Sequence, residues 1–257
     1  MAAAASAAAA AATPAERWSA ARANAWYAKQ AWIVGANFVP ADAINQLEMW
    51  QEATFDPAEI DRELGWAQDL GMNSMRVFLH DLLWQQDAAG FKRRIGKFLD
   101  IAARHGIRPI FVLFDSVWDP DPHLGPQRPP IPGVHNSGWV QGPGKAALED
   151  PKQYARLEAY VRNIVGSFGQ DQRVLAWDVW NEPKYDEERV VLLLGRVFTW
   201  ARDANPSQPL TSGLYGEAGS LTEKLNAIHG AKRGFDHRRR STHRQKAQRR
   251  HVQLGAG

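Results

Sequence analysis

The sequence from residue 175 to residue 183 reads LAWDVWNEP. Its apolar part is rich in aromatic and β-branched residues, which predicts a buried β-strand. The strand would end in a carboxamide and a carboxylate, because Asn181 and Glu182 follow directly and precede Pro183. Such polar groups at the end of a core strand call for an explanation, and the organisation of the chain around them supplies one.

Apolar segments of strand length alternate with amphipathic segments of helix length. The predicted strands cover residues 32–40, 74–80, 107–115, 174–183 and 209–216. The predicted helices cover residues 56–72, 88–106, 150–169 and 186–206, and a loop rich in Pro and Gly covers residues 116–150. This alternation predicts βαβ units and a parallel sheet with continuous apolar strands.

The first strand is followed by GANFVPAD, which lacks the Gly-x-Gly-x-x-Gly pattern of dinucleotide-binding folds. A length of 257 residues suits a barrel of alternating strands and helices. We therefore predict the α/β class and the (β/α)8 TIM-barrel type, incomplete, with about five βα units present.

Composition sets further bounds. A hydrophobic content of 44% is enough for one sizeable core. The chain has no run of 18 apolar residues, so the sequence predicts no membrane span. The chain has no Cys, which excludes disulfides, thiolate chemistry and Cys-ligated zinc. The absence of Cys leaves the compartment open.

Both ends differ from the body of the chain. Residues 1–25 form an Ala-rich segment, interpreted as the remnant of a secretory leader or as a flexible or helical Ala tract. The leader interpretation favours a secreted or periplasmic location. Residues 231–257 carry nine Lys or Arg against one Asp, a charge of +8, whereas the preceding residues sum to −5. We predict that this basic tail is disordered.

Polar residues lie at or just after the carboxyl ends of the predicted strands. They are Asn37, His80, Asp115, Asn181 and Glu182. In βα-barrel enzymes the active site is assembled at this end of the strands. The polar ending of residues 175–183 is then explained by its place at the mouth of a barrel.

Three stretches carry a resemblance to a known family: WDVWNEP at 177–183, NSMRVFL at 73–79 and GANF at 35–38. Together they resemble the retaining glycoside hydrolases with (β/α)8 barrels, most nearly glycoside hydrolase family 5, which contains cellulases and mannanases. The resemblance covers about residues 32–216. It implies that residues 26–230 form a partial glycosidase barrel domain.

The family's chemistry uses two carboxyl groups about 5 to 5.5 Å apart, one an acid/base and one a nucleophile. The resemblance implies that Glu182 is the acid/base, that Asn181 binds the sugar 2-hydroxyl, and that Arg76 orients the nucleophile. In the alternative interpretation Glu182 begins a helix and Arg76 forms a structural ion pair.

Aromatic residues near the predicted strand ends suit stacking on sugar rings. The predicted substrate-binding residues are Asn37, Phe38, His80, Trp84, Asp115, Trp118, Trp139 and Trp180. For most of the other tryptophans, Trp18, Trp26, Trp32, Trp66, Trp177 and Trp200, we predict core packing. Asp178 inside the fourth strand needs a partner, for which Arg76 or a His is the candidate.

Other chemistries have less support. The spacing of His80, His123 and His135 matches no zinc pattern, so we expect neither metal nor cofactor. No Gly-x-Ser-x-Gly motif is present, which argues against a Ser-His-Asp hydrolase.

The chain departs from the family after the fifth predicted strand. Only 42 residues follow Tyr215, whereas closing the barrel would need three more βα units of about 30 residues each. The family's nucleophile follows strand seven, so we predict a truncated chain with the acid/base half of the site and no retaining activity. Glu217 would lie beside Glu182, not across the scissile bond.

Two other functions stay open. The chain could be a non-catalytic carbohydrate-binding remnant, or its tail could bind a polyanion by charge alone. No motif predicts specific nucleic-acid recognition, and the oligomeric state stays open.

Overall fold

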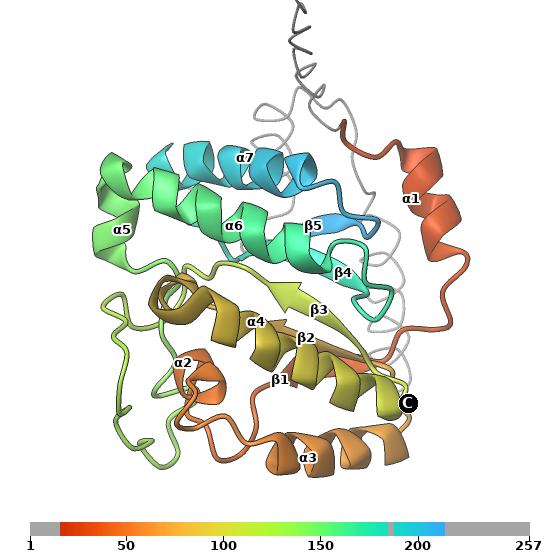
Figure 1. Ribbon diagram of the computed structural model, residues 1–257, viewed down its shortest axis with the longest axis horizontal. Coiled ribbons are helices and arrows are strands. Elements are labelled where there is room, and N and C mark those ends of the chain that lie inside the picture. Colours follow the sequence, from red (N-terminus) through yellow and green to blue (C-terminus); the bar gives the residue numbers. More distant parts are fainter. Residues whose placement is uncertain (1–15, 185–187, 214–257) are drawn as a thin grey trace, which may run out of the picture.

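The computed structural model describes residues 16–184 and 188–213. Five strands form one parallel sheet in the order β1-β2-β3-β4-β5 (Figure 1). The strands are β1 (Gly35–Phe38), β2 (Ser74–Phe78), β3 (Arg108–Val112), β4 (Ala176–Asn181) and β5 (Leu210–Gly213). The five predicted strands are confirmed in place and order, and each is shorter than the apolar run that predicted it.

The helices fill the connections between the strands. They are α1 (Ala20–Tyr27), α2 (Gln46–Trp50), α3 (Pro57–Asp69), α4 (Asp81–Arg104), α5 (Lys145–Glu149), the 3-10 turn η1 (Pro151–Gln153), α6 (Tyr154–Phe168) and α7 (Glu188–Asp203). Helices α3, α4, α6 and α7 pack side by side in chain order and lie along one face of the sheet (Figure 1). Parallel strands with helical crossovers in this order are the arrangement of a (β/α)8 barrel, of which five strands are described.

Local sequence signals explain where two helices begin. Asp56 caps α3 by accepting hydrogen bonds from the backbone N–H groups of Ala58 and Glu59, with Pro57 in the first turn. Helix α4 begins at Asp81, seven residues before the predicted start, because His80 caps it and a kink at Asp87 joins two helical pieces.

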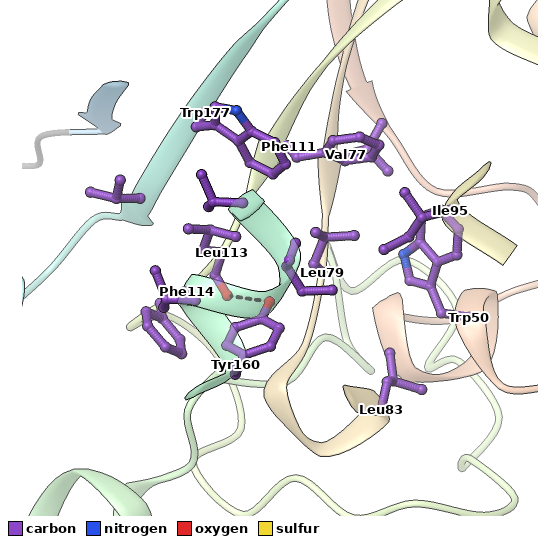
Figure 2. Close-up of a cluster of buried hydrophobic side chains, with 14 of the residues drawn as sticks. Trp50, Val77, Leu79, Leu83, Ile95, Phe111, Leu113, Phe114, Tyr160 and Trp177 are labelled. Carbon is purple, nitrogen blue, oxygen red and sulfur yellow. Dashed lines mark hydrogen bonds between the residues drawn. The ribbon is translucent and has the colours of Figure 1, made fainter. Parts of the chain in front are cut away.

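The side of the sheet that faces the helices is apolar. Phe111 of β3 lies 6.1 Å from Phe98 of α4 and 5.8 Å from Trp177 of β4, measured between ring centroids. Figure 2 shows this cluster, with Val77 of β2 beside Phe111 and Tyr160 of α6 below. Because side chains alternate along a strand, the residues next to these in the sequence point to the opposite face.

The tryptophans divide between the core and the surface. Trp177 and Trp200 are buried, as predicted, whereas Trp32 is 77% exposed and Trp66 is 56% exposed. The prediction of core packing is wrong for the last two. Trp66 lies on the outer side of α3, where the Arg62 guanidinium stacks 5.4 Å from its ring, and Trp32 precedes β1.

Within the described residues, β1 pairs only with β2, and β5 pairs only with β4. None of the described helices is long and apolar enough to cross a membrane. Residues 1–15 of the Ala-rich segment, Tyr215, Glu217 and the basic tail at 231–257 lie outside the described residues, so their predictions stay untested.

Candidate active site

The candidate site is built on the face of the sheet opposite the helices. Its centre is Arg76 of β2, which donates from Nε (3.0 Å) and Nη2 (2.5 Å) to Oδ2 of Asp178. Nη2 also donates to Oδ1 of Asn181 at 2.8 Å, and Nη1 approaches Oδ1 of Asn37 at 3.4 Å. Side chains from β1, β2 and β4 therefore meet around one guanidinium, and the predicted pairing of Asp178 with Arg76 is confirmed.

Asp178 is the buried anchor of this network. Its side chain is 4% exposed, and burial raises the pKa of its carboxyl, while the Arg76 guanidinium acts in the opposite direction. Its Oδ1 accepts hydrogen bonds from the backbone N–H groups of Trp180 (3.2 Å) and Gly213 (3.3 Å). A buried carboxylate bound in this way holds Arg76 in one orientation at the carboxyl end of the sheet.

Strand β4 is irregular at the point where the site begins. Its register with β5 shifts between Asp178 and Asn181, and the Ser212 hydroxyl bonds the Trp180 carbonyl at 2.7 Å. A bulge changes the direction of the side chains that follow it. Here it allows Asp178 and Asn181, which are three residues apart, to reach Arg76 from the same side of the strand.

Glu182 follows this irregularity with an unusual backbone. Its φ is 46°, in the left-handed region that non-glycine residues rarely adopt, and its N–H donates to the Gly213 carbonyl at 2.8 Å. Such a conformation costs about 1–3 kcal/mol and is kept only where the surroundings fix it. The Glu182 side chain is partly exposed, beside Asn181.

Asp115 closes the network on the side of β3. Its Oδ1 accepts hydrogen bonds from the Val117 N–H (2.9 Å) and from Asn181 Nδ2 (3.0 Å). Its Oδ2 is buried without a partner among the described residues. Burial raises the pKa of Asp115 to about 7, and Glu182 adds to the rise, whereas Asn181 and Arg76 act in the opposite direction.

Aromatic rings form a wall next to the polar network. The Arg76 guanidinium lies 4.9 Å from the centroid of the Phe78 ring, which packs edge-on against Trp139 at 5.2 Å. Trp139 packs against Trp118 at 5.9 Å. Trp118 and Trp139 are partly exposed, so both predicted aromatic residues border the network and present ring surface.

A hollow of about 490 Å³ lies beyond Trp139. The loop before α2 and the long loop after β3 form its walls. These loops are joined by Asn45, whose Nδ2 donates to the Gly138 carbonyl at 2.8 Å, and by Gln46, whose Nε2 donates to the Val140 carbonyl at 2.8 Å. The hollow combines apolar and polar lining with the size of an ordinary ligand pocket.

Four predicted substrate-binding residues are not brought to this site. Phe38 alternates with Asn37 and so faces the helices, where it packs 6.1 Å from Phe98. Trp180 is fully buried, packs against Phe114 and donates from Nε1 to the Ser116 hydroxyl at 2.8 Å. Their positions correct the expectation that nearness to a strand end places a ring on the rim.

The other two residues are Trp84, in α4, and His80, which caps that helix. Trp84 donates from Nε1 to Asn163 Oδ1 of α6 at 2.9 Å and packs on Tyr160, so it joins two helices. His80 is fully buried, and its Nε2 lies 3.0 Å from the Gln141 carbonyl while its Nδ1 accepts from the Leu82 N–H. Because a carbonyl can only accept, His80 carries its proton on Nε2.

His80 therefore has a supporting position. Burial lowers the pKa of its imidazole, which favours the neutral form that these two bonds require. The ring also lies against the long loop, since a Cβ added at Gly142 would come within 3.2 Å of it. His80 holds the loop that carries Trp118 and Trp139.

Two contributors were missed by the sequence reasoning. Phe78 lies two residues after Arg76, so strand alternation alone places both on one face, and this signal was available. Gly213 is harder to predict from the sequence, because its contribution is the absence of a side chain. A Cβ at this position would lie 3.1 Å from Arg76 Nη2 and from Asn181 Oδ1. Across the described part of the chain, no group of three or more His, Cys, Asp or Glu is placed to hold a metal.

No family model matches the sequence, and a search of curated proteins found no match. Solved structures do match the fold. A GH5_18 protein from Streptomyces cattleya, solved with GlcNAc, is 14% identical over 71% of this chain and 45% of its own, with a TM-score of 0.50. A glycoside hydrolase family 5 mannosidase from Rhizomucor miehei is 14% identical over 77% of this chain and 54% of its own, with a TM-score of 0.49.

An exo-β-1,4-mannosidase from Opitutaceae bacterium strain TAV5 is 22% identical over 71% of this chain and 32% of its own, with a TM-score of 0.48. The chain thus spans about half or less of the length of these solved chains. At these sequence identities the similarity shows the fold alone, and we base that statement on the Streptomyces structure, with its TM-score of 0.50. Within the described residues, the chain has five strands of a (β/α)8 barrel and the four helical crossovers between them, a fold that it shares with the Streptomyces structure.

Proposed function

We propose that this chain carries the acid/base half of a retaining glycoside hydrolase site that acts on β-linked polysaccharides or oligosaccharides. Glu182 donates a proton to the departing sugar oxygen and later accepts one from water. Asn181 binds the sugar 2-hydroxyl, and Arg76 supplies the positive charge at the base of the site.

The observation that carries the proposal is the backbone of Glu182 directly after the Arg76–Asn181 contact. A φ of 46° at a partly exposed carboxylate is a local strain that the flanking bonds to Gly213 and Asn181 maintain. Strain of this kind is concentrated at functional sites. In the structural alternative, Glu182 would need no such conformation to begin a helix.

The aromatic wall supports a carbohydrate ligand. Trp118 and Trp139 present ring surface next to hydrogen-bonding groups, which is the combination that binds sugars by stacking on one face and bonding at the edges. Trp139 also lines the hollow, which continues this surface.

A retaining mechanism also needs a nucleophile about 5 to 5.5 Å from the acid/base. Asp115 and Asp178 are the carboxylates of the network within the described residues, and both are buried and held by Asn181 or Arg76. Neither suits attack on a sugar carbon. We therefore propose that the described half-site binds and protonates but does not by itself complete retaining hydrolysis.

The test is hydrolysis of an aryl β-glycoside with an activated leaving group by the purified chain. The proposal expects no turnover above that of Glu182→Gln, together with binding of β-linked oligosaccharides that quenches or shifts Trp fluorescence. Turnover that disappears in Glu182→Gln would show that the chain holds a complete site. Absence of any sugar binding would remove the glycosidase proposal altogether.

The second candidate is carbohydrate binding without catalysis, which the exposed rings of Trp118 and Trp139 favour. It differs from the first in the role of Glu182. The binding function is preferred if Glu182→Gln binds sugars as well as the unaltered chain and if azide, added as an external nucleophile, releases no aryl leaving group from an activated glycoside.

A further inference from the structure

Asp115 is an unusual carboxylate for its position. It is 1% exposed at the end of β3, and its Oδ2 has no hydrogen-bond partner among the described residues. A buried polar atom without a partner costs about 1–3 kcal/mol, and more when charged. An aliphatic residue would avoid this cost. The reason for a carboxylate at this position therefore lies in its other oxygen, Oδ1, which accepts hydrogen bonds.

Oδ1 of Asp115 holds one end of the Asn181 amide. Asn181 Nδ2 donates to it at 3.0 Å, while Asn181 Oδ1 accepts from Arg76 Nη2 at 2.8 Å. Arg can only donate, so the amide oxygen must face Arg76 and the amide nitrogen must face Asp115. The two partners fix the amide at both ends, leaving one N–H of Asn181 for another acceptor.

We propose that Asp115 is a positioning residue, which clamps the Asn181 amide so that its remaining N–H faces the ligand bound beside Glu182. The clamp acts through Asn181 and needs no contact between Asp115 and the ligand. Its consequence for sugar binding rests on the proposed function, whereas the clamp itself is a property of the unliganded chain.

The strength of the clamp depends on the charge of Asp115. A hydrogen bond to an ionised carboxylate is roughly twice as strong as one to a neutral acceptor. The charged groups that act on Asp115 are Arg76 from β2 and Glu182 after β4, and the long loop presents backbone groups of Val117 and Gly142. His80 lies behind Gly142, and burial lowers the pKa of its imidazole. Since the pKa of Asp115 is raised to about 7, the clamp tightens as the pH rises through neutrality.

The experiment follows the side-chain amide of Asn181 by NMR in chains labelled with ¹⁵N-Asn. In the unaltered chain the Asn181 amide signals should shift with pH, with a midpoint near 7. In Asp115→Asn the transition near pH 7 should disappear, because Oδ1 of the new side chain still accepts the hydrogen bond but the titrating carboxyl is gone. Signals that do not move with pH in the unaltered chain would overturn the clamp.

Sugar binding supplies the second measurement. Asp115→Ala should weaken the binding of a β-linked oligosaccharide about fivefold to tenfold, the loss expected for one freed hydrogen bond, and Asp115→Asn should restore most of it. The matched control is Asp119→Ala, which removes an exposed carboxylate of the same loop. Among the described residues its side chain accepts one hydrogen bond, from the Asp121 N–H. Equal affinities in Asp115→Ala and the unaltered chain would overturn the positioning role.

The two measurements separate the possible failures. If no sugar binds to any variant while the amide titrates as described, the clamp stands and the proposed function fails. Should Asp115→Ala not fold, as checked by near-UV circular dichroism, the pH titration of Asn181 in the unaltered chain and in Asp115→Asn decides alone.

Discussion

The two faces of the sheet use neighbouring residues for different purposes. Trp177 packs into the helices while Asp178 binds Arg76, although the two residues are adjacent in β4. In β1, Phe38 packs against α4 while Asn37 faces the network. One face holds the fold together, and the other carries the polar groups of the site.

The role of a residue in this sheet depends both on its position along the strand and on the face to which its side chain points. All these residues lie at or near the carboxyl end of the sheet, but only those on the face opposite the helices meet around Arg76. A mutation on the helix face should therefore act on stability, whereas one on the network face should act on charge and on binding.

The largest effect is expected for Trp177→Ala. The Trp177 ring is fully buried against Phe111, and its Nε1 donates to Gln208 Oε1 at 3.1 Å. Removing it should lower the free energy of unfolding by about 4 kcal/mol. Urea denaturation followed by far-UV circular dichroism measures this, with the exposed Trp66→Ala as the control, for which a change within about 0.5 kcal/mol is expected. Similar losses in both variants would contradict the division between the faces.

On the network face, Arg76→Met tests the charge pair. It leaves Asp178 buried without its cation, which should cost about 3 kcal/mol of stability at neutral pH. In an Asp178→Asn background the same substitution should cost much less, because no buried charge is left unpaired. A double-mutant cycle by urea denaturation gives the coupling free energy between Arg76 and Asp178. If the effects of the two single substitutions simply add in the double variant, Asp178 does not anchor Arg76.

Strand and helix positions were predictable because they follow from local signals. The helix start at Asp56–Pro57 and the five apolar strands lie where the sequence predicts them, with small differences at their ends. The start of α4 was missed because His80 caps it, and His is not among the preferred capping residues.

The site was predictable in part. Parallel strands bring their carboxyl ends to one edge, and there hydrogen bonds join Asn37, Arg76, Asn181 and Asp115. Glu182 directly follows Asn181. The position of Asn181 relative to Asp178 depends on the irregular register of β4, which a nearly continuous apolar run does not reveal. The support that His80 gives to the long loop likewise depends on a contact between distant segments.

Asp115, on the network face, should make the stability of the chain depend on pH. The folded-state pKa of Asp115, about 7, lies above its ordinary value of 3.8, so the folded chain binds the proton more tightly than the unfolded chain. Its contribution to stability is complete below pH 3.8 and is lost as the pH rises toward 7. Between pH 5 and pH 7 the loss should be about 2 kcal/mol.

The measurement compares the unaltered chain with Asp115→Asn in urea at both pH values. Subtracting the two profiles removes the contributions of other groups, and the difference should favour the Asn variant more strongly at the higher pH. Parallel profiles would mean that Asp115 does not change its protonation over this range, and would also weaken the pH dependence of the Asn181 clamp.

The smallest effect concerns Trp84, which was predicted at the rim but lies between α4 and α6. Trp84→Phe keeps a ring against Tyr160 and loses only the hydrogen bond to Asn163, so stability should fall by about 1 kcal/mol. Because Trp84 belongs to the helix layer, its replacement should leave sugar affinity unchanged, as measured by fluorescence titration of the remaining tryptophans. A loss of affinity without a loss of stability would mean that Trp84 takes part in sugar binding, and that the helix layer contributes to it.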